Sequence, residues 1–392
     1  MKDPFPLQPS PRIKIAIDHY LSRVAEPLDL STLHYHSHEV ALAFLFYNFI
    51  YNRLSPWISM KLCPRTYANL PRKTRLNWDI HVVSFVQSVL ISAMALYVVA
   101  VDEERKVMGL AENWPERIWG YDGGLGLILA FACGYFAWDL AVSLLHADMF
   151  GFGILAHAVC ALTVFTLGFR PYANYFGPTF ILYELSTPFL NIHWFCDKLN
   201  LTGSRIQLIN GIILLCTFFS CRLVWGTYSS MQAFSDIYRA WTADKDELAL
   251  YLDRRTAALL PGSEDTMRYA GEMHMPAWLG ATYLAANLTL NSLNFFWFNK
   301  MIQTIRKRFD PPFGTRRAEK GKGKAEEPAD GGVLVASDVQ VGRGVGAEGR
   351  KSVEVEATRR VRRRNSFDEI ADEIAEAMEG MTGDDSELVG GL

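Results

Sequence analysis

The sequence has 392 residues, 50% of them hydrophobic and 13% aromatic, with a formal net charge of −3. The 6 cysteines contain no C-x-x-C pair, which argues against a disulfide framework and a zinc site. The charge gives no reason to expect nucleic-acid binding, and the sequence contains no phosphate loop, dinucleotide fingerprint or nucleophile elbow.

Several apolar runs predict an all-α, polytopic membrane protein, because roughly 20 apolar residues cross the hydrocarbon core as a helix. The N-terminus lacks the layout of a cleaved signal peptide, so the first span is expected to act as the insertion signal. About seven transmembrane helices are expected, at 38–60, 78–101, 124–146, 149–168, 173–196, 205–228 and 276–300.

The connectors predict an orientation. Connector 61–77 and the residues after the last span are rich in Lys and Arg, which places both in the cytoplasm under the positive-inside rule. The N-terminus is therefore expected in the lumen and the C-terminus in the cytoplasm. Between the last two spans, 229–275 is expected to be a charged loop with a short helix from about Glu247 to Leu260.

The N-terminal segment, 1–37, contains two patterns. Apolar positions from Ile13 to Val24 predict a short amphipathic helix that lies at the membrane interface. His34, His36 and His38 alternate before the first span, 38–60. This alternation indicates a polar juxtamembrane turn, with a metal site as the alternative if the segment is extended.

The C-terminal tail, 309–392, is expected to be disordered and cytoplasmic, because its composition offers too little apolar surface for a core. A basic cluster at Arg359–Arg364 precedes Ser366. The cluster is interpreted either as part of a solvated tail or as a patch for anionic lipids that phosphorylation of Ser366 would weaken.

The fifth expected span, 173–196, contains a carboxylate, Glu184, near its middle. Ionisable groups at that depth usually face a protein interior or a water-filled cavity. Pro188 removes a backbone donor and crowds the Glu184 carbonyl, which predicts a kink at that point. Ser186 and Thr187 are placed to satisfy freed backbone groups. The alternatives are a functional site and a structural kink.

Three expected spans bring further polar residues to similar depths. Asp139 in the third span and His157 in the fourth lie, like Glu184, between the midplane and the cytoplasmic face, counting about 1.5 Å per residue. Carboxylates and an imidazole in a cavity are acid–base groups in principle, whereas the structural alternative is an interhelical hydrogen-bond network. Tyr135 and Ser143 share a helix face with Asp139, and Thr187, Pro188 and Asn191 share one with Glu184. These five residues and Ser186 are the candidates for substrate contact.

Two further groups are interpreted as structural. Arg222 is expected near the lumenal end of the sixth span, where its side chain would snorkel to the interface. The asparagines Asn287, Asn291 and Asn294 in the last span are expected to hold helices together.

These motifs resemble a known family. Gly134-Tyr135-Phe136 with Asp139, then His157, then the run from Glu184 to Asn191, resembles the TLC domain of ceramide synthases and translocating-chain-associating membrane proteins, and is most similar to the small TLC domain-containing proteins. The resemblance covers about 72–308. It implies a six-helix core after one preceding span, around a cavity open to the cytoplasm or the bilayer.

The sequence departs from the ceramide synthases at their histidines. Their paired histidines are reduced to Ala156-His157, and a second histidine position is occupied by Tyr183. A third, in the first core span, is Gln87. These departures concern the activity and leave the expected fold unchanged.

The resemblance implies an endoplasmic-reticulum membrane protein that handles lipids or adjusts membrane lipid composition, with membrane lipids as its partners. One alternative is a ceramide-synthase-like N-acyltransferase acting on acyl-CoA and a sphingoid base, with His157 as general base and Asp139 or Glu184 orienting it. A transport or cargo adaptor that docks through its tail is the other alternative. No cofactor or metal is expected.

Overall fold

The computed structural model describes residues 11–146, 149, 152–258, 265–271 and 273–309, and their regular structure is entirely helical. The expectations for the tail after residue 309, including Arg359–Arg364 and Ser366, lie outside the described residues. The α-helices are α1 (Pro11–Leu28), α2 (Leu33–Phe49), α3 (Ser55–Leu62), α4 (Pro64–Asn69), α5 (Arg72–Val101), α6 (Glu103–Met108), α7 (Trp114–Trp119), α8 (Gly123–Leu145), α9 (Phe152–Leu167), α10 (Phe176–Ile181), α11 (Thr187–Lys198), α12 (Arg205–Phe218), α13 (Gly226–Thr242), α14 (Lys245–Ala258) and α15 (Ala277–Phe309). Two π-helical segments, η1 (Ile50–Leu54) and η4 (Phe219–Trp225), and two 3₁₀ segments, η2 (Ala111–Asn113) and η3 (Leu182–Ser186), complete the order.

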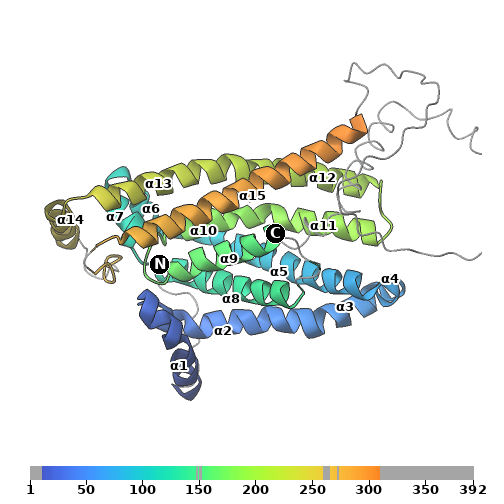
Figure 1. The fold of residues 1–392 in the computed structure, drawn as a ribbon, viewed down its shortest axis with the longest axis horizontal. Helices are drawn as coiled ribbons and strands as arrows, with labels where there is room; N and C mark the ends of the chain where they lie inside the picture. Colours follow the sequence, from blue (N-terminus) through green and yellow to red (C-terminus); the bar gives the residue numbers. More distant parts are fainter. Residues whose placement is uncertain (1–10, 147–148, 150–151, 259–264, 272, 310–392) are drawn as a thin grey trace, which may run out of the picture.

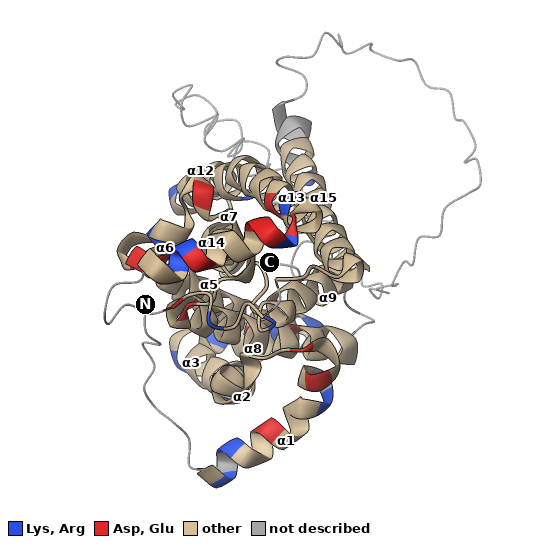
Figure 2. Ribbon diagram, turned by 90° about the vertical axis from the view of Figure 1, so that its left-hand side faces the viewer, with Lys and Arg blue, Asp and Glu red and all other residues tan. Residues whose placement is uncertain are grey.

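The long helices lie side by side along the long axis of the molecule, whereas α1 runs across one end of the bundle (Figure 1). Among the described residues, the stretches Arg72–Val101, Gly123–Leu145 and Arg205–Thr242 are long and apolar enough to cross a membrane. Seen end on, charged residues colour α1, α6 and α14, while α2, α8 and α9 are almost free of them (Figure 2). The predicted all-α polytopic membrane protein is confirmed; the number of seven spans stays a prediction.

Two expected elements differ from the structure. The segment expected as one kinked helix at 173–196 consists of α10, η3 and α11, and Pro188 lies in the first turn of α11. A proline is tolerated there because first-turn N–H groups have no partner within the helix.

The expected sixth span does not end at residue 228. The helix continues as α13 to Thr242 and occupies the first part of the expected loop. Ala233, Ile237 and Ala240 are buried at helical spacing along α13, but the polar Asp236 is buried beside them, and the other face exposes Tyr238 and Trp241 among polar residues. Polar residues on both faces lower the average over a hydropathy window, which therefore misses the helix. The short helix expected near Glu247 is confirmed as α14.

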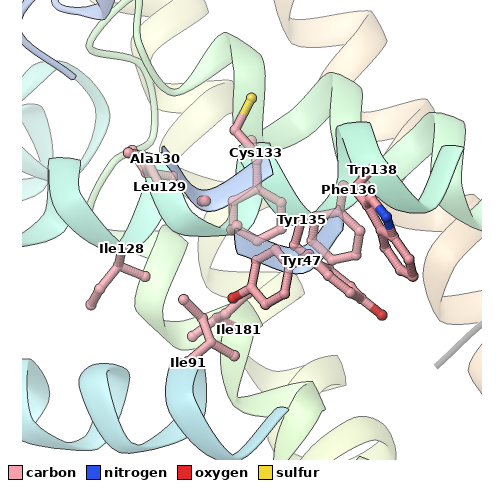
Figure 3. Packing of buried hydrophobic residues seen from close by; sticks show 14 of the residues in the cluster. Tyr47, Ile91, Ile128, Leu129, Ala130, Cys133, Tyr135, Phe136, Trp138 and Ile181 are labelled. Atoms are coloured by element: carbon pink, nitrogen blue, oxygen red, sulfur yellow. The ribbon is translucent and has the colours of Figure 1, made fainter. Parts of the chain in front are cut away.

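The first core cluster lies where α2 packs on α8. Gly134 makes this approach possible, since a Cβ built there would lie 2.6 Å from the Ala43 Cβ. Figure 3 shows Tyr135 of α8 beside Tyr47 of α2, with Phe136 and Trp138 next to it along α8. This part of the bundle fixes the rotation of α8 and hence the direction of its polar face.

The alternating histidines lie in helix α2, so the expected juxtamembrane turn is wrong. His36 is fully buried, with its Nδ1 2.6 Å from Glu39 Oε2 and its Nε2 2.7 Å from the Tyr121 hydroxyl. A Cβ on Gly126 would lie 2.3 Å from the His36 ring, so the glycine makes room for it. These contacts give His36 a structural role.

The helix expected from Ile13 to Val24 is confirmed as α1, which is slightly longer at both ends. Ile15 and Tyr20 are exposed on it. Its position at the membrane interface stays a prediction.

Candidate functional site

The site is centred on Arg222, which lies in the π-helical segment η4 in the middle of the long α12–η4–α13 helix. Its side chain is 1% exposed, so the expectation that it snorkels at a helix end is wrong. The reason is the continuation of the helix through α13, which puts Arg222 far from any terminus. π segments within α-helices are frequent at functional sites.

The Arg222 guanidinium is held from several sides. Its Nε donates to the Tyr183 carbonyl at 3.0 Å and to Ser186 Oγ at 3.1 Å. Its Nη1 donates to Asn294 Oδ1 at 3.0 Å, and its Nη2 to Thr187 Oγ1 at 3.1 Å. Every acceptor in this set is uncharged, so these hydrogen bonds stabilise the buried cation independently of a counter-ion.

The counter-ion is Glu184, whose Oε1 lies 3.7 Å from Arg222 Nη2. That distance is an ion pair and exceeds a normal hydrogen bond. The side chain is 3% exposed, and its second oxygen, Oε2, has no hydrogen-bond partner among the described residues. Only one of the two carboxylate oxygens therefore interacts with a cation of the protein.

The local backbone places Glu184 through Pro188. A proline cannot donate to the carbonyl four residues before it, and here that carbonyl belongs to Glu184. The Thr187 N–H donates to the Glu184 carbonyl instead, in the 3₁₀ pattern of η3. Ser186 Oγ donates to the Tyr183 carbonyl at 3.2 Å, in line with the expected repair of the backbone around this proline.

His157 of α9 is the third member of the site. Its side chain is buried, and neither ring nitrogen has a hydrogen-bond partner among the described residues. Its ring packs 6.1 Å from the Phe136 ring and 5.7 Å from the Trp297 ring, measured between centroids. A buried imidazole without partners is unusual, because a buried unpaired polar atom costs about 1–3 kcal/mol.

Glu184, His157 and Arg222 line one cavity of about 50 Å³. Tyr183 and Asn294 belong to the same wall, and the remaining lining is largely aromatic and aliphatic. The volume is far below the roughly 300–1,000 Å³ of a small-molecule pocket, but large enough for water or a small polar group. The cavity thus presents open polar atoms in a confined space.

The candidate residues of α8 lie beside this cavity and do not line it in the described structure. Asp139 and Ser143 are buried, and Asp139 lies within electrostatic range of Glu184. The Tyr135 ring lies 5.3 Å from the Tyr47 ring (Figure 3), and its hydroxyl is within hydrogen-bonding reach of Ser84. Asp139 and Glu184 were expected to share a cavity with His157. In the structure Asp139 interacts with Glu184 only electrostatically and does not line the cavity that holds His157.

Asn191 faces α5 and belongs to a neighbouring polar cluster. Its Oδ1 lies 2.6 Å from His81 Nδ1, and its Nδ2 donates to Ser84 Oγ at 3.1 Å and to the Thr187 carbonyl at 3.0 Å. The His81 ring stacks on Trp194 with 4.1 Å between centroids. Sequence reasoning missed His81 and the role of Arg222, although both carry the signal that identified Glu184, an ionisable group inside an apolar run.

One acidic trio, Asp102, Glu104 and Asp122, has ligand atoms within 4.8 Å of one another, the spacing of a metal site. It lies on the segments that follow α5 and precede α8, and each of its members already has an interaction partner. The trio is therefore treated as part of the scaffold.

Fold and site together define a polytopic, all-α membrane protein with ionisable groups enclosed by its helices. Comparison with known proteins identifies the family: the model of the TLC domain matches residues 77–303, and the chain belongs to this family. No solved structure matches.

Several relatives share much of the chain. An uncharacterised TLC domain-containing protein of Schizosaccharomyces pombe is 38% identical over 76% of this chain and 88% of its own length. The topoisomerase I damage affected protein 4 of Saccharomyces cerevisiae is 23% identical over 70% of this chain and 86% of its own length. The human TLC domain-containing protein 4 is 28% identical over 46% of this chain and 67% of its own length.

Proposed function

We propose that this protein binds membrane lipids within its helical bundle and takes part in the lipid homeostasis of the endoplasmic reticulum. The observation that carries the proposal is the cavity wall, where Glu184 Oε2 and both His157 ring nitrogens are buried without partners among the described residues. Such atoms lose free energy unless water or a ligand completes them.

The surroundings of the cavity favour a lipid as that ligand. The cavity is enclosed by helices of the membrane-spanning TLC domain, and we infer that its ligand comes from the hydrocarbon phase that surrounds these helices. Phe136, Phe165 and Phe180 line its apolar side. A polar group attached to hydrocarbon matches such a mixed lining, as in most ligand sites.

Acyl transfer is the second candidate function, and the unpartnered His157 ring favours it. A neutral imidazole with an open nitrogen can take a proton from an attacking amine or hydroxyl. The cavity volume of about 50 Å³ weighs against it, since an acyl group and its acceptor must be in the site together. We therefore prefer lipid binding to acyl transfer as the proposed function. The cargo-adaptor alternative has no support among the described residues.

The test is lipid retention by the purified full-length chain. Mass spectrometry would compare the lipids that copurify with the native protein, with Glu184→Gln and with Glu103→Gln. Glu103 is 78% exposed and serves as the matched control, because the same change at an exposed carboxylate costs little. We expect Glu184→Gln to lose about tenfold or more of a near-stoichiometric lipid, the effect of roughly one polar contact to a charged group.

Unfolding temperature and membrane abundance control for folding. Glu184→Gln keeps the shape of the side chain and leaves Arg222 its four uncharged acceptors, so the variant is expected to fold. The same lipid profile in all three proteins contradicts the proposal. Acylation of a sphingoid base by the native protein, lost in His157→Ala, would move acyl transfer to first place.

A further inference from the structure

A second hollow lies on the outward side of the seam between α9 and α15. It is a groove of about 640 Å³, formed by Phe152, Gly153 and Ala156 of α9 and by Leu293, Phe296 and Trp297, among other residues, of α15. This volume falls within the range of roughly 300–1,000 Å³ for ligand pockets, whereas the polar cavity is far smaller.

The groove is lined mainly by apolar side chains. None of its lining residues is charged, and its two hydroxyl groups are already used. Thr289 Oγ1 donates to the Ala285 carbonyl at 2.8 Å, and Ser292 Oγ donates to the Leu288 carbonyl at 2.7 Å, both within α15. The groove therefore favours an apolar chain and offers a polar group little compensation for its lost hydration.

The exposed lining residues indicate where the groove opens. Phe152 of α9 is 84% exposed, and Leu288 and Phe296 of α15 are 55% and 47% exposed. Exposed large apolar side chains on both walls of a groove are expected in lipid and are costly in water. The groove thus faces the hydrocarbon of the bilayer.

The groove and the polar cavity are neighbours. Trp297 is 2% exposed and lines the groove, while its ring lies 5.7 Å from the ring of His157, which lines the cavity. On α9 the groove ends at Ala156 and the cavity begins at His157. A molecule that is too large for the cavity can therefore be divided between the two spaces.

The open atoms of the cavity define the polar end of such a molecule. Arg222 and Glu184 carry opposite charges, so the pair leaves no net charge for a ligand to neutralise. The open Glu184 Oε2 accepts a hydrogen bond, and a neutral His157 offers one donor and one acceptor. A hydroxyl group can donate to the carboxylate and accept from the imidazole, whereas a phosphate or carboxylate would be repelled by Glu184.

We propose that an uncharged, hydroxyl-bearing lipid lies across the α9–α15 seam. Its hydroxyl group occupies the cavity between Glu184 and His157, and one hydrocarbon chain passes Trp297 into the groove. This assignment rests on the proposed lipid binding and adds the class of lipid and the path by which it enters.

The experiment is photolabelling of the full-length protein in phosphatidylcholine vesicles. Two hydroxyl-bearing probes, a photoactivatable diacylglycerol and a photoactivatable sterol, are compared with a phosphatidic acid that has the same chains as the diacylglycerol. We expect at least one hydroxyl probe to label α9 or α15 saturably, about tenfold or more above the phosphatidic acid, because the charged probe loses at least one favourable polar contact.

Gly153→Leu fills the groove and is expected to lower this labelling about tenfold, by the displaced chain contacts. The change is sterically mild, since a Cβ there would meet only the Leu293 Cδ2 at 3.6 Å. Ala285→Leu, at an exposed position of α15 outside the groove, is the matched control and should label like the native protein. If Gly153→Leu does not accumulate, Ser292→Phe fills the groove from its exposed wall.

Equal labelling by the charged and uncharged probes, unaffected by the groove-filling variant, overturns the proposal and means that only surrounding bilayer lipid was captured. Hydroxyl-selective labelling that Glu184→Gln abolishes and Gly153→Leu leaves intact overturns the groove but keeps lipid binding in the cavity. Absence of any retained lipid in the copurification experiment overturns the proposed function itself.

Discussion

Two buried arginine–carboxylate pairs each have one member on the long α12–η4–α13 helix, and they differ in how many carboxylate oxygens are hydrogen-bonded. Near the end of the bundle, Arg117 holds Asp236 with two bonds, Nε to Oδ2 at 2.6 Å and Nη2 to Oδ1 at 2.9 Å. Its Nη1 donates to the carbonyls of Met108 and Leu110. Both carboxylate oxygens are used, and no lining residue of the polar cavity belongs to this pair.

The pair in the middle of the helix is open. Arg222 donates four hydrogen bonds to uncharged acceptors, two of them from its single Nε–H, and Glu184 approaches it only to 3.7 Å, with Oε2 unbonded at the cavity wall. Burial of an ion pair is therefore a poor guide to function, since both pairs are buried. The informative difference is the oxygen that the fold leaves unused.

The largest expected effect separates the two pairs by stability. Asp236→Asn removes the charge that both bonds of Arg117 depend on, and breaking a buried pair from one side costs about 3–5 kcal/mol. Glu184→Gln breaks only the long contact, and we expect it to cost under about 2 kcal/mol. Thermal unfolding in mild detergent and abundance in membranes measure both. Equal losses for the two variants would mean that the pairs are equivalent.

A smaller loss of stability is expected from Gly226→Ala, which displaces Tyr183 beside the Arg222–Glu184 pair. A Cβ at this position would lie 2.5 Å from the Tyr183 hydroxyl oxygen and 2.7 Å from the nearest ring carbon, so the ring has to move. Overpacking of this kind costs about 1–3 kcal/mol. Lipid retention should fall as well, because the Tyr183 carbonyl accepts from Arg222.

Gly280→Ala is the control for this variant, since its Cβ would meet Met275 Sδ at 3.4 Å and Ile237 Cγ2 at 3.5 Å, ordinary contacts. Adding Tyr183→Phe to Gly226→Ala removes the closest atom and should recover part of the stability. No recovery in the double variant would show that the clash is elsewhere.

The smallest expected effect is that of Pro188→Ala. Proline in the first turn of a helix contributes little beyond restricting the unfolded chain, so the stability should change by less than about 1 kcal/mol. The new N–H can compete with the Thr187 N–H for the Glu184 carbonyl and draw η3 toward an α-helix, which would shift the carboxylate. Lipid retention should therefore drop while the unfolding temperature hardly moves. Pro115→Ala, in the first turn of α7, is the matched control. Normal retention in Pro188→Ala would remove any special role for η3.

The sequence was informative where a residue type was unusual for its surroundings, such as an ionisable group in an apolar run. Glu184 and His157 were singled out because ionisable groups inside apolar runs are costly, and both line the cavity. Pro188 indicated an irregular backbone, but a lone proline does not tell whether a helix bends or restarts, and the structure has a 3₁₀ segment before a new helix.

What sequence reasoning missed depends on distances between helices. Arg222 was placed at a helix end because the polar residues scattered along α13 lower its average hydropathy and hide the continuation of the helix. The contact of His81 with Asn191 joins α5 to α11, two helices more than 100 residues apart in places, and no local pattern encodes it. Asp139 and Ser143 were expected on one polar helix face and both are buried, yet the cavity that such a face meets depends on the rotation of α8.

The π segment η4 also sets the phase of the long helix. Its hydrogen bonds span five residues where an α-helix spans four, so it shifts every later side chain around the helix axis. Deleting one residue from η4 to leave a plain α-helix would turn Asp236 by about 100° relative to α12. Asp236 would then point away from Arg117, although neither residue had been changed. The π-helical turn around Arg222 therefore sets the orientation of the cavity residues relative to the Arg117–Asp236 pair. An insertion or deletion in this turn would disturb both sites.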